Sequence, residues 1–248
     1  SSTCLGLRTP LQAALEVLRE RHTWAVALSR KLKMSCAQVR GAARLVGSSL
    51  LVANDMATLG MILQTNGLPC LQDLYLEGSG LGDAAMQALC EVLGRCAAPS
   101  LRILALSFNN FGPASAEALA AALGRGAMPK LERLFLLGNP IGNRGVAALA
   151  APLRKLPALS QLLLGRCVIG DEGVASLVDN LGKDDFKALQ HLLLYNNKIT
   201  DAGVAKLLAA LDAGGLLKLV SYNCFIHNNP ASAVAVEAVN HALVKRSQ

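Results

Sequence analysis

The chain has 248 residues, and 52% of them are hydrophobic. This length accommodates one large domain or two small ones, and the sequence contains no run of the roughly 20 apolar residues that a bilayer-spanning helix requires. The formal net charge is +7 at pH 7, but residues 1–45 hold eight Lys and Arg against two acids (+6), whereas the remainder holds 16 against 15 (+1). This asymmetry indicates a local anionic contact near the N-terminus and argues against a nucleic-acid surface along the whole chain.

The N-terminal segment, residues 1–45, is predicted to be a basic helical cap. Its stretch TPLQAALEVLRERH has the apolar spacing of an amphipathic helix. The next stretch, TWAVALSRKLKMS, leaves an alternative open, because it also fits one more degenerate strand and turn anchored near His22. The candidate anion-contacting side chains of the cap are Arg30, Lys31, Lys33, Arg40 and Arg44.

Between residues 46 and 228 the template L-x-x-L-x-L-x-x-N-x-I recurs about seven times, with intervals of 25 to 30 residues. The five clear copies begin at Leu71, Leu101, Leu131, Leu159 and Leu189, and two weaker copies begin at Val46 and Leu216. Each L-x-L stretch alternates as a strand does, and each is followed by a stretch such as GVAKLLAAL with helical spacing. Strands that recur once per repeat with a helix between them must be parallel. We therefore expect an α/β solenoid, a horseshoe whose concave face is a parallel sheet and whose convex face is helical.

The turns of each repeat carry further predictions. Asn54, Asn109, Asn139 and Asn197 fill the Asn position of the template, with Cys167 and Cys224 replacing Asn in two copies. We expect the amides to hydrogen-bond the bend of their own and adjacent repeats. Aspartates at the starts of the helices are predicted to act as N-caps, and Pro152 is predicted to shorten or kink its helix. The aspartates are Asp83, Asp171 and Asp201.

Residues 229–248 are predicted to form a C-terminal capping helix. Asn229 is the expected N-cap, and Pro230 stands at the first helical position, where its missing N–H is tolerated. Repeat arrays need such atypical ends, because the outer face of a terminal repeat has no neighbour.

The strings IGDEGVASLVDNL, ITDAGVAKLLAAL and LERLFLLGNPIGNRGVAALA resemble the ribonuclease-inhibitor-like class of leucine-rich repeats. That class includes ribonuclease inhibitor, the repeat domains of NOD-like receptors and Ran GTPase-activating protein. The resemblance covers about residues 46–245 and implies a horseshoe with a binding role. The sequence lacks a G-x-x-x-x-G-K-[ST] nucleotide site and the high cysteine content of ribonuclease inhibitor.

Candidate binding residues come from the x positions of the strands, which are expected to face the concave side. They form an apolar stripe with aromatic anchors, with acids toward its N-terminal end and cations toward its C-terminal end. Such a patch on a protein surface is typical of an interaction site. The partner-binding candidates are Tyr75, Glu77, Ile103, Phe135, Leu137, Arg133, Leu163, His191, Leu193, Tyr195, Lys218 and Tyr222.

We therefore expect a non-catalytic module that binds a protein partner on its concave face, alone or as a subunit of a larger assembly. Permanent cover of the stripe by a terminal segment or a neighbouring chain is the other interpretation. A GTPase-activating function, with Arg133 or Arg166 as the exposed arginine, follows from the resemblance alone. A third alternative is docking onto a ribonucleoprotein through the basic cap.

Catalytic and cofactor chemistry is not expected. The four histidines are scattered among different repeats, and no catalytic motif or cofactor motif is present. Seven cysteines with no C-x-x-C pair predict free thiols, neither disulfide-bonded nor holding a metal. Free thiols fit an intracellular, reducing compartment, either cytoplasmic or organellar.

Overall fold

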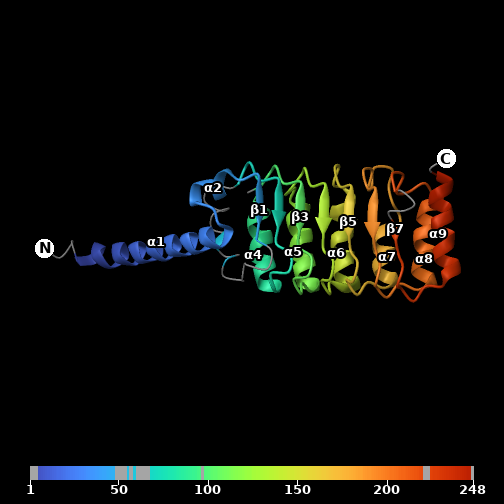
Figure 1. The fold of residues 1–248 in the computed structure, drawn as a ribbon, viewed down its shortest axis with the longest axis horizontal. Helices are drawn as coiled ribbons and strands as arrows, with labels where there is room; N and C mark the ends of the chain where they lie inside the picture. Colours follow the sequence, from blue (N-terminus) through green and yellow to red (C-terminus); the bar gives the residue numbers. More distant parts are fainter. Residues whose placement is uncertain are drawn as a thin grey trace.

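A computed structural model of the protein describes residues 5–47, 55, 58–59, 68–95, 98–219 and 224–246. In this part of the chain a parallel sheet of seven strands, in the order β1 to β7, forms one side of a solenoid, and helices form the other (Figure 1). The strands are β1 (Arg44–Val46), β2 (Asp73–Tyr75), β3 (Ile103–Ala105), β4 (Arg133–Phe135), β5 (Gln161–Leu163), β6 (His191–Leu193) and β7 (Cys224–Phe225). The helices are α1 (Leu5–Leu32), α2 (Cys36–Gly41), α4 (Asp83–Leu93), α5 (Pro113–Gly124), α6 (Gly142–Arg154), α7 (Asp171–Val178), α8 (Asp201–Asp212) and α9 (Ala233–Arg246).

The core follows the leucine template. The central leucine of each strand from β2 to β6 is buried, and these leucines stand in register from strand to strand. Helices α4 to α9 each pack against the next helix along the chain, so that one continuous core runs along the solenoid. The predicted parallel sheet and the alternation of strand and helix are confirmed.

The asparagine position links neighbouring repeats as predicted. The side-chain amide of Asn139 donates to the backbone oxygens of Leu106 and Leu136 at 2.9 and 3.0 Å. Its oxygen accepts the N–H groups of Asn109 and Phe111 in the preceding repeat at 2.9 and 3.1 Å. A buried asparagine thereby satisfies main-chain groups of two adjacent bends that no strand or helix pairing reaches.

Cys167 occupies the same position in its repeat with different chemistry. Its thiol donates to the backbone oxygen of Leu136 at 3.2 Å. Burial raises the pKa of this thiol to about 12, so it remains protonated at neutral pH. The thiol has no amide oxygen with which to accept as Asn139 does, and the preceding turn differs: the N–H of Ile141 bonds to the backbone oxygen of Asn139, and Gly142 has a positive φ of 61°.

The predicted register of the first repeat is wrong. Strand β1 pairs Leu45 with Leu74, whereas the frame beginning at Val46 places Ser49 at that position, four residues later. Ala42 occupies the first leucine position of this repeat and is buried. Because this residue is alanine, the repeat lacks the first leucine that marks the other repeats in the sequence. Pairing with β2 sets the register of the strand instead. Asn54, the predicted slot residue of this repeat, lies outside the described residues.

The predicted register of the last repeat is also wrong. Cys224 pairs with Leu192, a position that the frame beginning at Leu216 assigns to Leu219, five residues earlier. Cys224 is therefore a strand residue and does not occupy the asparagine position.

Asn229 takes the asparagine position of this repeat and is not the N-cap of the final helix. Its amide donates to the backbone oxygens of Leu194 and Ile226 at 3.0 and 2.7 Å, the pattern seen at Asn139. Helix α9 begins at Ala233, and the hydroxyl of Ser232 accepts the N–H of Ala235 at 3.2 Å.

The predicted aspartate N-caps are displaced by one residue. The N-cap positions belong to Gly82, Gly170 and Thr200, whose backbones are extended, so each aspartate is the first residue within its helix. Each carboxylate instead accepts hydrogen bonds from the start of the next repeat. Asp171, for example, accepts the N–H groups of Thr200 and Gly203 at 2.8 and 3.0 Å.

The structure excludes one alternative at the N-terminal segment and corrects the predicted shortening of the helix at Pro152. Residues 5–32 form one uninterrupted helix, which excludes a strand near His22. Helix α6, with 13 residues, is longer than α4, α5, α7 and α8, so Pro152 does not shorten it. The proline lies in the last turn, so few helical residues follow the point where its missing N–H removes a hydrogen bond.

Helix α1 extends away from the solenoid (Figure 1). Its C-terminal end packs on the body through Leu28, which is fully buried, while Leu15, Val17 and Trp24 are exposed. Among the described helices, none combines the length and apolar character that crossing a bilayer demands.

Candidate functional site

The side chains that flank each central leucine project from the side of the sheet opposite the helices, and we call this surface the sheet face. Three rows of residues cross it from strand to strand, because the strands and the residues just after them are in register. The start row is Arg44, Asp73, Ile103, Arg133, Gln161 and His191. The middle row is Val46, Tyr75, Ala105, Phe135, Leu163 and Leu193. The end row, which follows the strands, is Glu77, Ser107, Leu137, Gly165, Tyr195 and His227.

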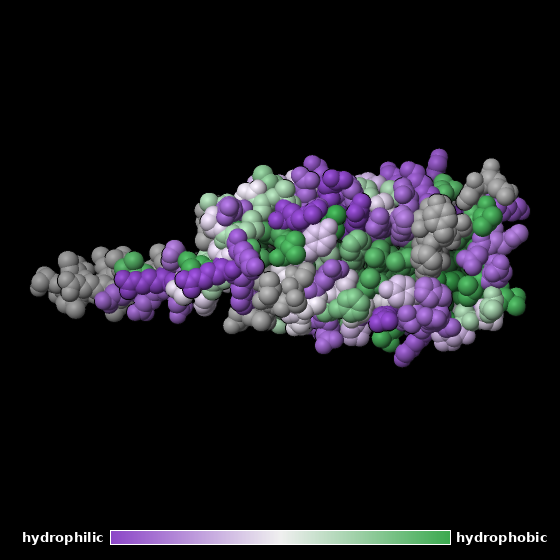
Figure 2. Space-filling view, in the orientation of Figure 1, coloured by the Kyte–Doolittle hydropathy of each residue, from purple (hydrophilic) through white to green (hydrophobic). Residues whose placement is uncertain are grey.

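The middle row is apolar along its whole described length. Tyr75, Phe135, Leu163 and Leu193 are each half-buried, so each presents part of its side chain to solvent. Ala105 is fully buried between its larger neighbours. Hydrophobic side chains accordingly gather along the middle of the solenoid at the level of the strands, with hydrophilic side chains above and below them (Figure 2).

The end row builds a second apolar stretch over a glycine. A Cβ atom on Gly165 would lie 2.8 Å from the Tyr195 ring and 3.0 Å from a methyl group of Leu137. Gly165 therefore makes room for these two side chains to converge over the sheet. The Tyr195 ring also stacks on His227, with centroids 5.2 Å apart and planes 2° from parallel. His227 was not among the predicted site residues, because the wrong register of the last repeat concealed its place in this row.

Phe108 adds an aromatic ring that sequence reasoning missed. It is 53% exposed and has a positive φ of 59°. A Cβ atom on Gly138 would lie 2.4 Å from the Phe108 ring, so this ring rests where Gly138 has no side chain. The template placed Phe108 in a turn, and only the pairing of Phe and Gly across two repeats reveals the contact.

The start row is polar and carries the charges. Arg44 forms an ion pair with Asp73 at 2.7 Å and lies over the Tyr75 ring at 5.6 Å. Arg44, predicted in the basic cap, is therefore part of the sheet face. Ile103 is only 9% exposed, which leaves little of this predicted contact residue accessible. Arg133 is exposed and His191 is half-buried.

One ion pair borders the start row. Arg102 donates to both carboxylate oxygens of Glu132 at 2.8 and 2.9 Å. These hydrogen bonds hold the pKa of Glu132 below its ordinary value. The bidentate pair neutralises this carboxylate, and the neighbouring Arg133 makes no ion pair within the described part of the chain.

Ser107 is a polar residue of the end row, between Glu77 and Leu137. It is 1% exposed, and its hydroxyl is the one buried side-chain oxygen or nitrogen without a hydrogen-bond partner in the described residues.

Other predicted residues lie elsewhere or outside the described structure. Lys218 belongs to the loop between α8 and β7, where it lines a cavity with Lys183 and Lys187, and it is not on the sheet face. Tyr222 lies outside the described residues. Lys31 of the predicted basic cap pairs with Asp55 at 2.5 Å.

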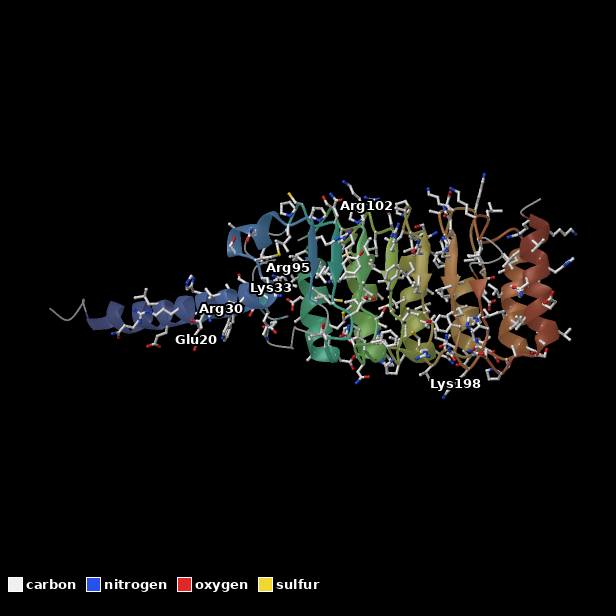
Figure 3. The ribbon with its side chains drawn as sticks, in the orientation of Figure 1. Glu20, Arg30, Lys33, Arg95, Arg102 and Lys198 are labelled. Carbon is white, nitrogen blue, oxygen red and sulfur yellow. The ribbon has the colours of Figure 1, made fainter. Side chains whose placement is uncertain are left out.

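The remaining cap cations lie near the base of α1 and in α2. Arg30 and Lys33 are exposed at the C-terminal end of α1 (Figure 3). Arg40 lies in helix α2. Apart from Arg44, the cap cations therefore lie in the first two helices or in the short connection between them.

Comparison with known protein families identifies leucine-rich repeats in two segments of the chain. The leucine-rich repeat family profile matches residues 97–120 and 158–178. A search of curated proteins found no match. Among solved structures, the chain is similar to one described as the crystal structure of a TDR receptor, with 16% sequence identity and a TM-score of 0.32. The alignment covers 71% of this chain and 32% of that chain, so the protein spans about a third of the length of that receptor.

The matched segments and the in-register parallel strands define the protein as an α/β leucine-rich repeat solenoid. Repeats of this kind form modules for protein–protein interaction.

Proposed function

We propose that the protein is a non-catalytic binding module of the ribonuclease-inhibitor-like class, and that it holds a protein partner on its sheet face. The apolar middle row carries this proposal: it has four half-buried, large side chains, with Ala105 between the first two, on strands that neighbouring strands fix in place. Apolar and aromatic side chains on a rigid support are typical of the centre of an interface.

The end row supports the same surface. Leu137, Tyr195 and His227 continue the apolar area beyond the strands, and Phe108 extends it at the adjoining turn. Because the glycines at positions 138 and 165 leave room for neighbouring rings, these rings have defined positions before any partner arrives. Little side-chain entropy is then lost on binding.

The test is affinity purification with crosslinking, using the full chain as bait in cells that express it. A triple variant, Tyr75→Ser, Phe135→Ser and Tyr195→Ser, removes three half-buried rings of the sheet face. We expect the wild-type chain to capture a partner and the folded triple variant to lose it.

The matched control carries apolar-to-serine changes away from the sheet face, at Leu217, Val234 and Val244, which are all exposed. This control should capture the partner as the wild type does. If the folded triple variant captures the same partner undiminished, the sheet face is not the binding surface and the proposal is wrong.

A further inference from the structure

The geometry points to an acidic amphipathic helix as the occupant of the sheet face, lying across the strands along the middle and end rows. The inference rests on the proposed binding function and specifies the shape and charge of the partner segment. Three features of the sheet face carry it: its satisfied backbone, the dimensions of its apolar floor and the placement of its cations.

The backbone of the sheet offers no pairing to an extended peptide on this face. Strands β2 to β6 are each hydrogen-bonded to a neighbour on both sides. An extended segment gains affinity mainly by adding main-chain hydrogen bonds at a strand edge, and such bonds are not available above a paired sheet. A helix brings its own backbone hydrogen bonds and needs only side-chain contacts.

The middle and end rows together form the apolar floor of the sheet face, and its length and width suit one helix. The middle and end rows are two residues apart along each strand, or about 7 Å. From β2 to β7 the strands advance by five spacings, or about 24 Å. A helix rises about 1.5 Å per residue, so about 16 residues in helical form cover this distance.

Cations border this floor at both ends of the strands. Arg133 stands at the start of β4 and Arg166 follows the end row of β5, and both are exposed and make no ion pair in the described structure. Their strand positions differ by five residues, which corresponds to about 17 Å along the strand direction. A helix with its side chains is about 10–12 Å wide, so carboxylates on both of its flanks come within reach of the two arginines.

The two ends of the strands form opposite edges of the solenoid. Arg102, just before β3, and Lys198, after the end row of β6, lie at opposite edges (Figure 3). Lys198 is exposed and adds a second cation after the end rows, in the repeat that follows Arg166. No Asp or Glu occupies the three rows on β4, β5 and β6, and the nearest acid before them, Glu132, is bound by Arg102.

Charges on β2, at the N-terminal end of the sheet face, determine where the acidic part of the partner helix should lie. On β2 the start row holds Asp73, which Arg44 neutralises, and the end row holds the half-buried Glu77. Carboxylates of the partner are therefore favoured over β4 to β6 and disfavoured beside Glu77. The partner helix should carry its acidic flanks toward the C-terminal repeats of the solenoid.

The test is a selection from a display library of random peptides of about 18 residues against the full chain. We expect the enriched peptides to share apolar residues at i, i+3, i+4 and i+7 with Asp or Glu on both flanks. Circular dichroism of a synthetic copy should show added helix on mixing with the protein. Affinity should fall about tenfold or more for the double variant Arg133→Glu and Arg166→Glu.

The matched control is the double variant Arg95→Glu and Arg144→Glu, which changes the net charge equally at exposed positions on the helical side. It should bind the peptides as the wild type does. Enrichment of extended or basic peptides, equal affinity for both double variants, or no enrichment over a selection on the triple serine variant would overturn the inference. Such an outcome leaves the binding function intact if the cellular partner still depends on Tyr75, Phe135 and Tyr195.

Discussion

At the scale of single residues, helix caps in this solenoid are supplied from the neighbouring repeat. Asp83, Asp171 and Asp201 each accept hydrogen bonds from the start of the following repeat. Asn143 does the same with its amide oxygen, which accepts the N–H of Gly170 at 2.7 Å. The same side chain that begins one helix thus satisfies an N–H at the start of the next, and it couples the two repeats.

Asp171 allows this coupling to be measured. Replacement by alanine removes the acceptor of two N–H groups and of the Thr200 hydroxyl, and we expect a loss of about 1–2 kcal/mol in the free energy of unfolding. Replacement by asparagine should lose less, because Asn143 shows that an amide oxygen can serve. Urea denaturation of the three proteins decides this, and equal losses for alanine and asparagine would contradict it.

The pH dependence of stability follows from the same carboxylates. Hydrogen bonds from Ser115 and Gly112 lower the pKa of Asp83, and those from Lys155 and Gly182 lower the pKa of Asp185. Burial alone would raise the pKa of Asp171, but its hydrogen bonds from the next repeat bring the net value below the ordinary one. A carboxylate whose pKa is lowered by folding stabilises the folded state above its unfolded pKa.

This contribution is lost as the pH falls through the folded value. We therefore expect the thermal midpoint to be steady near neutral pH and to decline below about pH 4. Calorimetric or dichroism melts across the acid range measure the decline. The Asp171→Asn protein should decline less steeply than the wild type, and parallel curves for the two would contradict the assignment to this group.

At the scale of elements, the sequence was most informative where each repeat keeps its leucines. The strands from β2 to β6, the helices that follow them and the asparagine position were all predictable, because each signal recurs with the same spacing. The predicted registers of the two end repeats are wrong by four and five residues; in the first of these repeats, Ala42 stands where the other repeats have leucine. Register there depends on pairing with the adjacent strand, which no local pattern encodes.

On the sheet face, too, some residues were predictable from the sequence and others were not. Tyr75, Phe135 and Tyr195 were predictable from strand alternation alone. Phe108 and His227 were not, because their places depend on a glycine or a ring in a neighbouring repeat. Gly138 and Gly165 each lie against an aromatic ring of an adjacent repeat, Phe108 and Tyr195 respectively, so a glycine next to an aromatic position one repeat away is the signal in the sequence.

The asparagine position provides a prediction about how two repeats are joined. Asn139 is fully buried and makes hydrogen bonds to both its own repeat and the preceding one. Asn139→Ala leaves several main-chain groups unpaired and should cost about 2–4 kcal/mol in the free energy of unfolding. Asn139→Cys should cost less, because Cys167 is already accommodated at the equivalent place through a donated hydrogen bond. Chemical denaturation measures both, and a cysteine variant no more stable than the alanine variant would contradict this account.

At the scale of the whole molecule, stability should reside in the stacked repeats and not in the helix that precedes them. The described side chains of α1 between Gln12 and Trp24 are exposed, whereas Leu28 is fully buried in the core. Among the described side chains of α1, those that contribute apolar burial to the solenoid lie in its last two turns.

Deleting residues 1–24 should accordingly lower the helical signal by dichroism while changing the free energy of unfolding by less than about 0.5 kcal/mol. By contrast, Leu28→Ala creates a cavity where α1 meets the first repeat and should cost about 2–4 kcal/mol in the free energy of unfolding.

Trp24, the one tryptophan of the sequence, is 48% exposed, so its fluorescence should be quenched by acrylamide in the folded protein. A truncation as destabilising as Leu28→Ala, or a tryptophan shielded from the quencher, would mean that the outer turns of α1 pack on the solenoid in solution. The basic N-terminal helix would then be part of the folding unit, because its removal would expose surface that the repeats bury.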